Sequence, residues 1–234
     1  MLVAAVATFL VVVFAAAIVF PGCGGSSGPV DPATVLADSS AKMKAISGFH
    51  FVYEVHKPQS AQPGSGLEIG RMTGDVNAAG DMTALVDATY SGLPVTVGII
   101  ALGETYYVQD PISQKWKSVA AADSPVGKLS LNSGTIRILD EITNTSFVGE
   151  ESKGGVKTYH IKGQVADTEV KAIAGLVDLG VTPTFPTDLY IGVKDGLVYE
   201  VDIYGAATQE ETKDYWRSIV LSDLGKSVAV EAPK

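Results

Sequence analysis

The chain has 234 residues, 46% of them hydrophobic, and its 26 acidic and 17 basic residues give a formal net charge of -9. Phosphate binding needs clustered Lys and Arg, so this charge balance excludes nucleic acid as an expected partner. An anionic membrane surface would also repel such a chain. With a single cysteine, no intramolecular disulfide can form, and the folded part must be held together by its core.

The N-terminal segment is an uncharged apolar run from Leu2 to Phe20 that leads to Pro21, Gly22 and Cys23. Its length fits a secretory signal or a spanning helix, and length alone does not choose between them. Phe20 and Gly22 match the lipobox of bacterial lipoproteins, whereas Pro21 and the lack of a basic residue before the run depart from it. We therefore expect residues 1–22 to be a lipoprotein signal peptide. The alternative is an uncleaved membrane anchor with an incidental cysteine.

Lipidation of Cys23 by acyl chains such as palmitate would place the exported chain on the outer face of the cytoplasmic membrane. Two or three chains anchor a protein stably, whereas one binds only marginally. Residues 23–31 then form the lipidated cysteine and a flexible linker rich in Gly, Ser and Pro. The spacer from Gly24 to Val30 spans at most about 25 Å when extended, so the domain is held close to the bilayer.

A single domain is expected over residues 32–234. It opens with a helix to about Ile46, because Asp31 is a good N-cap and Pro32 suits the first helical position. Alternation of apolar and polar residues then predicts strands. Their ranges are 49–57, 67–76, 82–90, 95–102, 105–109, a short one from 115–117, 146–151, 156–163, 189–194, 197–204, 215–222 and 228–231.

Three glycine-containing turns predict hairpins: Gly103-Glu104, Gly154-Gly155 and Asp195-Gly196. Two helical segments interrupt the strands. Residues 125–142 are expected to be helical in parts, and Asp167 can cap a helix that ends before Gly180. This order of elements indicates an α+β plan, in which a curled antiparallel sheet packs helices against one side.

Residues 95–102 have few strongly polar positions on either face, which indicates a strand covered on both sides. The cover is either helices and core, or the wall of a cavity that receives an apolar ligand. Periodicity alone does not choose between these interpretations.

The sequence resembles the mycobacterial LppX/LprA/LprF/LprG lipoprotein family over nearly the whole mature chain. The resemblance is carried by the lipobox, the opening helix, Trp116 and the segments 82–94, 104–108 and 220–233. It implies a half-open antiparallel β-barrel with helices packed on its concave side, similar to the LolA/LolB carriers. It also implies a hydrophobic cavity that holds acylated lipids or glycolipids, which the protein carries within the cell envelope.

The resemblance implies an acylated lipid or glycolipid as ligand, a lipid exporter as a further partner, and no cofactor, metal or enzymatic activity. The expected cavity wall consists of apolar strand positions, which are Phe51, Tyr53, Val86, Val97, Ile99, Leu189, Ile191, Val201 and Ile203. The alternative function is a surface-tethered interaction or envelope-stress-sensing module, with a filled core and no ligand.

Two weaker catalytic or metal hypotheses also follow from the residues. Ser39 and Lys42 have the S-x-x-K spacing of penicillin-binding enzymes, but the partner motifs are missing and the segment is expected to be an exposed part of the first helix. His50, Glu54 and His56 share one face of a strand and could contact a metal, although a solvated strand face explains them more simply. Whether His160 approaches them is open from the sequence.

Overall fold

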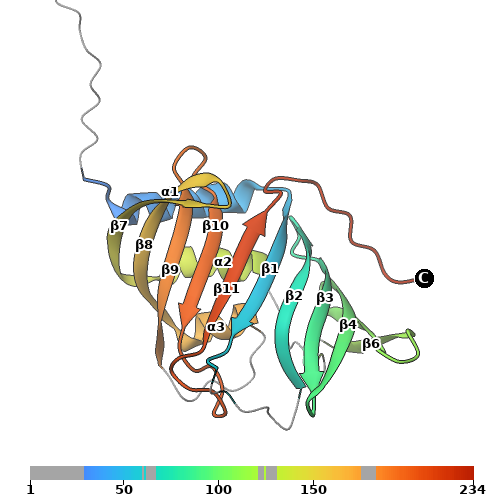
Figure 1. Ribbon diagram of the computed structural model, residues 1–234. Helices are drawn as coiled ribbons and strands as arrows, with labels where there is room; N and C mark the ends of the chain where they lie inside the picture. Colours follow the sequence, from blue (N-terminus) through green and yellow to red (C-terminus); the bar gives the residue numbers. More distant parts are fainter. Residues whose placement is uncertain (1–28, 60, 62–66, 121–123, 125–130, 175–182) are drawn as a thin grey trace, which may run out of the picture.

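The structure is a computed structural model, and it describes residues 29–59, 61, 67–120, 124, 131–174 and 183–234. Within these ranges, eleven strands form one antiparallel sheet in the order β6-β5-β4-β3-β2-β1-β11-β10-β9-β8-β7 (Figure 1). The edge strands β6 and β7 do not pair, so the sheet is open. None of the helices in these ranges is long and apolar enough to cross a membrane.

The strands are β1 (Gly48–His56), β2 (Leu67–Asn77), β3 (Met82–Tyr90), β4 (Leu93–Leu102), β5 (Thr105–Gln109), β6 (Trp116–Ala120), β7 (Thr143–Lys153), β8 (Val156–Ala166), β9 (Thr184–Gly192), β10 (Val198–Tyr204) and β11 (Trp216–Ser222). The helices are α1 (Pro32–Ala45), α2 (Leu131–Glu141) and α3 (Asp167–Ala174). This is the expected α+β fold class, a half-open antiparallel barrel rather than a closed one.

The opening helix α1 begins as predicted. The Asp31 carboxylate accepts hydrogen bonds from the backbone N–H groups of Ala33 and Thr34, and Pro32 occupies the first turn. Hydrogen bonding to Thr34 also lowers the pKa of Asp31. The cap therefore fixes where the folded domain starts, directly after the expected linker.

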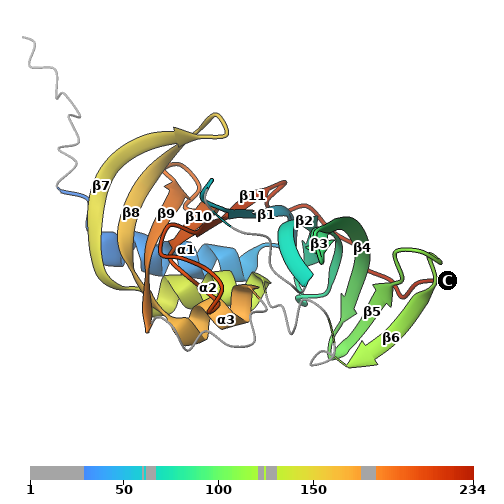
Figure 2. The ribbon, with the colours of Figure 1, turned by 60° about the horizontal axis from the view of Figure 1, so that its bottom comes forward.

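The sheet curves around the three helices, which lie on its concave side (Figure 2). Both views place the helices across the half of the sheet from β7 to β1, whereas β2 to β6 extend beyond them. Strand β1 pairs with β2 on one side and β11 on the other, so it joins the two halves. Antiparallel pairing brings the start and the end of the domain together at the centre of the sheet.

The prediction of a strand at 228–231 is wrong, because no strand follows β11 in the described part of the chain. Gly225 donates a backbone hydrogen bond to Gly48, and the chain then leaves the sheet. A strand needs a free sheet edge, and β10 and β1 already occupy both sides of β11. The predicted helix from Asp167 is present as α3 to Ala174, and the remainder of that prediction lies outside the described residues.

Candidate functional site

The nine predicted wall residues all lie on one face of the sheet, the concave face. The strand register proves this, because directly opposed residues in an antiparallel pair project to the same side. Tyr53 is opposite Met72, Met72 opposite Val86, and Val86 opposite Val97. On the other side Tyr53 is opposite Ile219, which leads to Val201 and Leu189. The predicted residues therefore share one surface that extends over the seven neighbouring strands from β4 to β9.

All nine side chains are buried, with exposed fractions between 0% and 9%. Sequence reasoning missed several neighbours that complete the same surface. They share the face of the predicted positions by register and two-residue alternation, and they are Met72, Val76, Ala84, Ile161, Val165, Phe185, Ile219 and Leu221. Their two-residue alternation could have identified them.

Helix side chains join the same core cluster from the concave side. They are Leu36 and Met43 of α1, Ile138 and Leu139 of α2, and Val170 of α3. Two buried hydroxyl groups on these helices, Ser39 Oγ and Thr135 Oγ1, have no hydrogen-bond partner. The concave face is thus apolar on both layers, with few polar groups between them.

One buried ion pair interrupts the apolar surface near the start of β11. Arg217 is 1% exposed, and its register with Val55 and Ile203 places it on the concave face. Its guanidinium binds both carboxylate oxygens of Glu211 and the carbonyl of Gly205. Burial raises the pKa of the adjacent Tyr53, an effect that Arg217 partly offsets. No sequence pattern indicates this pair, because neither residue lies in a recognisable motif.

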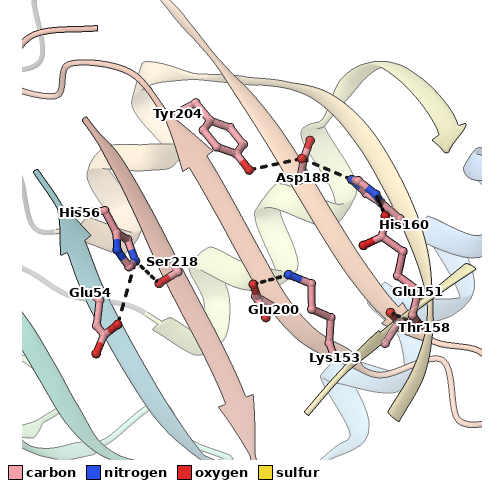
Figure 3. A network of polar contacts seen from close by, with 10 residues as sticks. All are labelled: Glu54, His56, Glu151, Lys153, Thr158, His160, Asp188, Glu200, Tyr204 and Ser218. Carbon is pink, nitrogen blue, oxygen red and sulfur yellow. Dashed lines mark hydrogen bonds and ion pairs between the residues drawn. The ribbon is translucent and has the colours of Figure 1, made fainter. Parts of the chain in front are cut away.

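The convex face carries an extended polar network instead (Figure 3). Asp188 accepts a hydrogen bond from the Tyr204 hydroxyl and lies 3.3 Å from His160 Nε2. Lys153 forms an ion pair of 2.7 Å with Glu200 and lies over the Tyr190 ring. The two faces of the sheet are therefore chemically distinct.

Asp202 is the most perturbed acid on this face. It is 4% exposed and lies directly opposite Asp188 on β9. Burial, followed by the nearby Glu200, raises its pKa to about 7, and one of its carboxylate oxygens has no hydrogen-bond partner. Asp202 therefore takes up a proton far more readily than an exposed aspartate.

The histidines do not converge on a metal site. His50, Glu54 and His56 share the convex face as predicted. His56 lies 4.0 Å from Glu54, but their hydrogen bonds go elsewhere: His50 to Asp75, Glu54 to Arg71 and His56 to Ser218. His160 is on β8, four strands from β1, which corresponds to about 19 Å. No group of three or more potential metal ligands occurs among the described residues.

The S-x-x-K segment is not the exposed surface that we expected. Ser39 and Ser40 are buried, at 0% and 2% exposure, because they lie on the side of α1 that packs against the rest of the domain. Ser40 donates a hydrogen bond to Asp140 of α2. Lys42 forms an ion pair with Asp38 at the surface. Ser39, the serine of this spacing, is fully buried and Lys42 is paired with Asp38 at the surface, which argues against a catalytic pair.

Cover on both faces of residues 95–102 is found only in part: on the convex face Gly98 is buried, whereas Thr96 is exposed. The cover of that face also differs from both expected kinds. Val97, Ile99 and Ala101 are buried on the concave face. On the convex face, Gly98 lies beneath Gln109 and Trp116, whose atoms would be 2.7 and 2.9 Å from an added Cβ. The convex cover is therefore supplied by the neighbouring strands β5 and β6.

Three cavities are lined by described residues. One of about 480 Å³ is lined by residues that include Lys162, Asp188 and Tyr204. One of about 290 Å³ lies between the turns after β7 and β9, and one of about 520 Å³ lies beside Trp116 and the C-terminus. The cavity expected between sheet and helices stays a prediction, and Cys23 lies outside the described residues.

The fold is an open, curved antiparallel sheet with an apolar concave face and helices on that side. It defines an α+β protein of the half-open barrel class. The sequence pattern of the LppX_LprAFG lipoprotein family matches residues 31–230. The chain therefore belongs to this family, as the resemblance predicted. No curated protein matches the chain at the threshold that we applied.

Two solved structures have the same fold. LprF from Mycobacterium bovis is 18% identical with a TM-score of 0.65, over 86% of this chain and 96% of that chain. The lipoprotein LppX from Mycobacterium tuberculosis is 18% identical with a TM-score of 0.59, over 86% of this chain and 98% of that one. A LolA superfamily protein from Nitrosomonas europaea is 10% identical with a TM-score of 0.31, over 88% of this chain and 96% of that one, and this likeness is too weak to carry an argument.

Proposed function

We propose that the protein is an exported lipoprotein, anchored by acyl chains on Cys23 at the outer face of the cytoplasmic membrane, that binds acylated lipids or glycolipids. The ligand tails lie against the concave face and are carried within the cell envelope. The observation that supports this proposal is the shared orientation of the nine wall residues, which form one apolar surface across the sheet.

The physical reason for such a carrier is the cost of exposing lipid tails to water. Each buried CH₂ group contributes about 0.8 kcal/mol, so moving several acyl chains through water costs tens of kcal/mol. A concave apolar surface removes most of this cost without any bond chemistry. The proposed activity is therefore binding and transfer rather than catalysis, and a lipid exporter is the proposed donor or acceptor.

The second candidate is a tethered interaction or envelope-stress-sensing module with a filled core. One observation favours it: the nine wall side chains are buried by other atoms of the protein itself. In that case the concave face is an ordinary hydrophobic core. The charge of -9 and the short linker are compatible with both candidates.

Native mass spectrometry of the protein, purified from its own membrane in mild detergent, separates the two candidates. Lipid carriage predicts a stoichiometric mass increment beyond the acyl chains on Cys23, and organic extraction should release acylated lipid in that ratio. A protein that carries no lipid increment, and acquires none when incubated with total membrane lipid, contradicts the carrier proposal. Such a result would support the filled-core module.

A further inference from the structure

The β3–β4 hairpin ends in an unusually apolar tip. Tyr90 and Leu93 are directly paired across it, and Ser91 and Gly92 form the turn with φ values of 48° and 79°. Positive φ at both central residues is typical of a tight type I′ turn. Tyr90 is 59% exposed and Leu93 is 69% exposed. The two largest side chains at this tip are thus presented to the surroundings on a rigid turn.

The tip is continuous with the concave apolar face. The register pairs Val86 with Val97, then Ala88 with Val95, then Tyr90 with Leu93, so all six side chains project to the same side. Along β3 the exposed fraction rises from 2% at Val86 to 7% at Ala88 and 59% at Tyr90. No polar side chain interrupts this strip. An apolar path therefore leads from the buried wall to the exposed tip.

Charge also distinguishes this hairpin. Residues 88–103 contain no Asp, Glu, Lys, Arg or His. Four other hairpin turns in the described ranges carry a charged residue, namely Asp81, Glu104, Asp110 and Asp195, and the Gly154-Gly155 turn directly follows Lys153. The β3–β4 tip has no charged residue. Exposed apolar patches mark surfaces that meet a membrane or another protein.

We propose that Tyr90 and Leu93 dock the domain on a lipid bilayer and form the lip over which lipid tails reach the concave face. The net charge of -9 opposes electrostatic attraction to an anionic surface, so docking must use apolar contacts. Tyrosine is enriched where proteins meet the membrane–water interface. The second half of this proposal rests on the proposed lipid carriage, whereas docking does not.

A single environment-sensitive label tests the docking. In the full chain reconstituted in phosphatidylcholine vesicles, Leu93→Cys is labelled with a nitrobenzoxadiazole dye. Ile112→Cys is the matched control, because Ile112 is a 93% exposed apolar residue in a turn that also contains Asp110 and Lys115. The unsubstituted protein, treated in the same way, gives any background from Cys23.

We expect the dye at position 93 to shift to the blue and to be quenched by brominated phosphatidylcholine, and the dye at position 112 to show neither effect. Equal quenching at both positions, or none at position 93, overturns the proposal. A blue shift at position 93 that depends on protein concentration rather than on vesicles would assign the tip to self-association and would also overturn it.

Lipid transfer tests the second half. A double substitution, Tyr90→Ser with Leu93→Ser, should slow transfer of a fluorescent phospholipid between vesicles about tenfold, equivalent to about 1.4 kcal/mol, and leave bound lipid per protein unchanged. Ile112→Ser should transfer at the normal rate. A normal transfer rate in the double variant would overturn the proposal that Tyr90 and Leu93 form the lip for lipid tails. If the unsubstituted protein binds no lipid, the carrier proposal fails, while the labelling experiment still decides the docking.

Discussion

Arg217 and Glu211 form a bidentate pair in the interior of the domain, with both carboxylate oxygens of Glu211 2.5 Å from Nη2 of Arg217. Their side chains are 1% and 13% exposed, respectively. Glu211 also accepts a hydrogen bond from the backbone N–H of Ala207. The pair therefore ties the loop between β10 and β11 to the concave face, beside Tyr53.

Removing one partner of this pair should destabilise the domain strongly. Glu211→Ala leaves a buried guanidinium without a counter-ion, and such a loss costs about 3–5 kcal/mol. The matched control is Glu150→Ala, which removes an exposed pair with Lys157 and should cost at most about 1 kcal/mol. Urea denaturation measures both values. Similar losses for the two variants would contradict the structural role of the buried pair.

The concave face should dominate stability over the convex face. Ile99→Ala deletes a fully buried side chain and should lower the unfolding free energy of delipidated protein by about 2–5 kcal/mol. Leu85→Ala changes a residue that is 53% exposed, and it should stay within about 0.5 kcal/mol of the unsubstituted protein. Thermal and urea unfolding test this difference. Equal effects would mean that Ile99 is not enclosed in solution.

Two glycines on β2 should differ sharply in their tolerance of alanine. A Cβ at Gly74 would overlap the carbonyl oxygen of Thr83 and lie 2.8 Å from Ala84 Cα, so the backbone of β3 would have to move. We expect Gly74→Ala to cost at least about 2 kcal/mol. At Gly70 the nearest atom would be 3.6 Å away, and Gly70→Ala should change stability by under about 1 kcal/mol. Equal tolerance would contradict the close approach of β2 and β3.

Asp202 should make stability depend on pH. Its pKa is about 7 in the folded protein against 3.8 for an ordinary aspartate, so between these values the folded state holds more protons than the unfolded state. The contribution of this group is fully favourable below about pH 4 and is lost as the pH rises to 7. Asp202→Asn should remove this dependence.

At pH 8 the gain from Asp202→Asn should be about 1–2 kcal/mol, after allowance for solvent screening. Asp214→Asn, at an exposed loop position, is the control and should leave the pH dependence unchanged. Urea titrations at pH 4, 6 and 8 measure both. An unchanged pH profile in Asp202→Asn would show that burial does not perturb this carboxyl group.

Lipidation of Cys23 is tested in cells. Cys23→Ser should lose incorporation of labelled palmitate and should fail to be processed at this position, because no thiol is left to acylate. Mass spectrometry of the N-terminal peptide of the unsubstituted protein should show acyl chains on Cys23. An unmodified Cys23 in a membrane-bound protein that keeps residues 1–22 would instead support an uncleaved anchor.

Much of the strand pattern was predictable because the period-two alternation is a local property. The strands at 82–90 and 105–109 were predicted with the bounds that the structure has. Strand β4 begins earlier than predicted, at Leu93, because Pro94 can pair with Thr89 at the end of a hairpin. This shift reduces the predicted four-residue connection to the two-residue turn at the apolar tip.

Partners that come from distant parts of the chain were not predictable. The pairing of β1 with β11 joins residues at least 160 positions apart, and a hydrogen bond between His56 and Ser218 spans the same pair of strands. The predicted strand at 228–231 failed for the same reason, since whether an edge is free depends on the whole sheet. The burial of Ser39 and Ser40 depends likewise on the packing of α1 against other elements.

The sequence by itself determined the class of domain, the apolar positions of its strands and the family, because alternation, capping and turn chemistry are encoded in neighbouring residues. Only the tertiary structure decided that the nine wall residues form one concave surface, that Arg217 is paired inside it, and that the surface reaches the exposed tip at Tyr90 and Leu93. The physical reason is register: which side chains meet across a sheet is set by long-range pairing, and no local pattern records it.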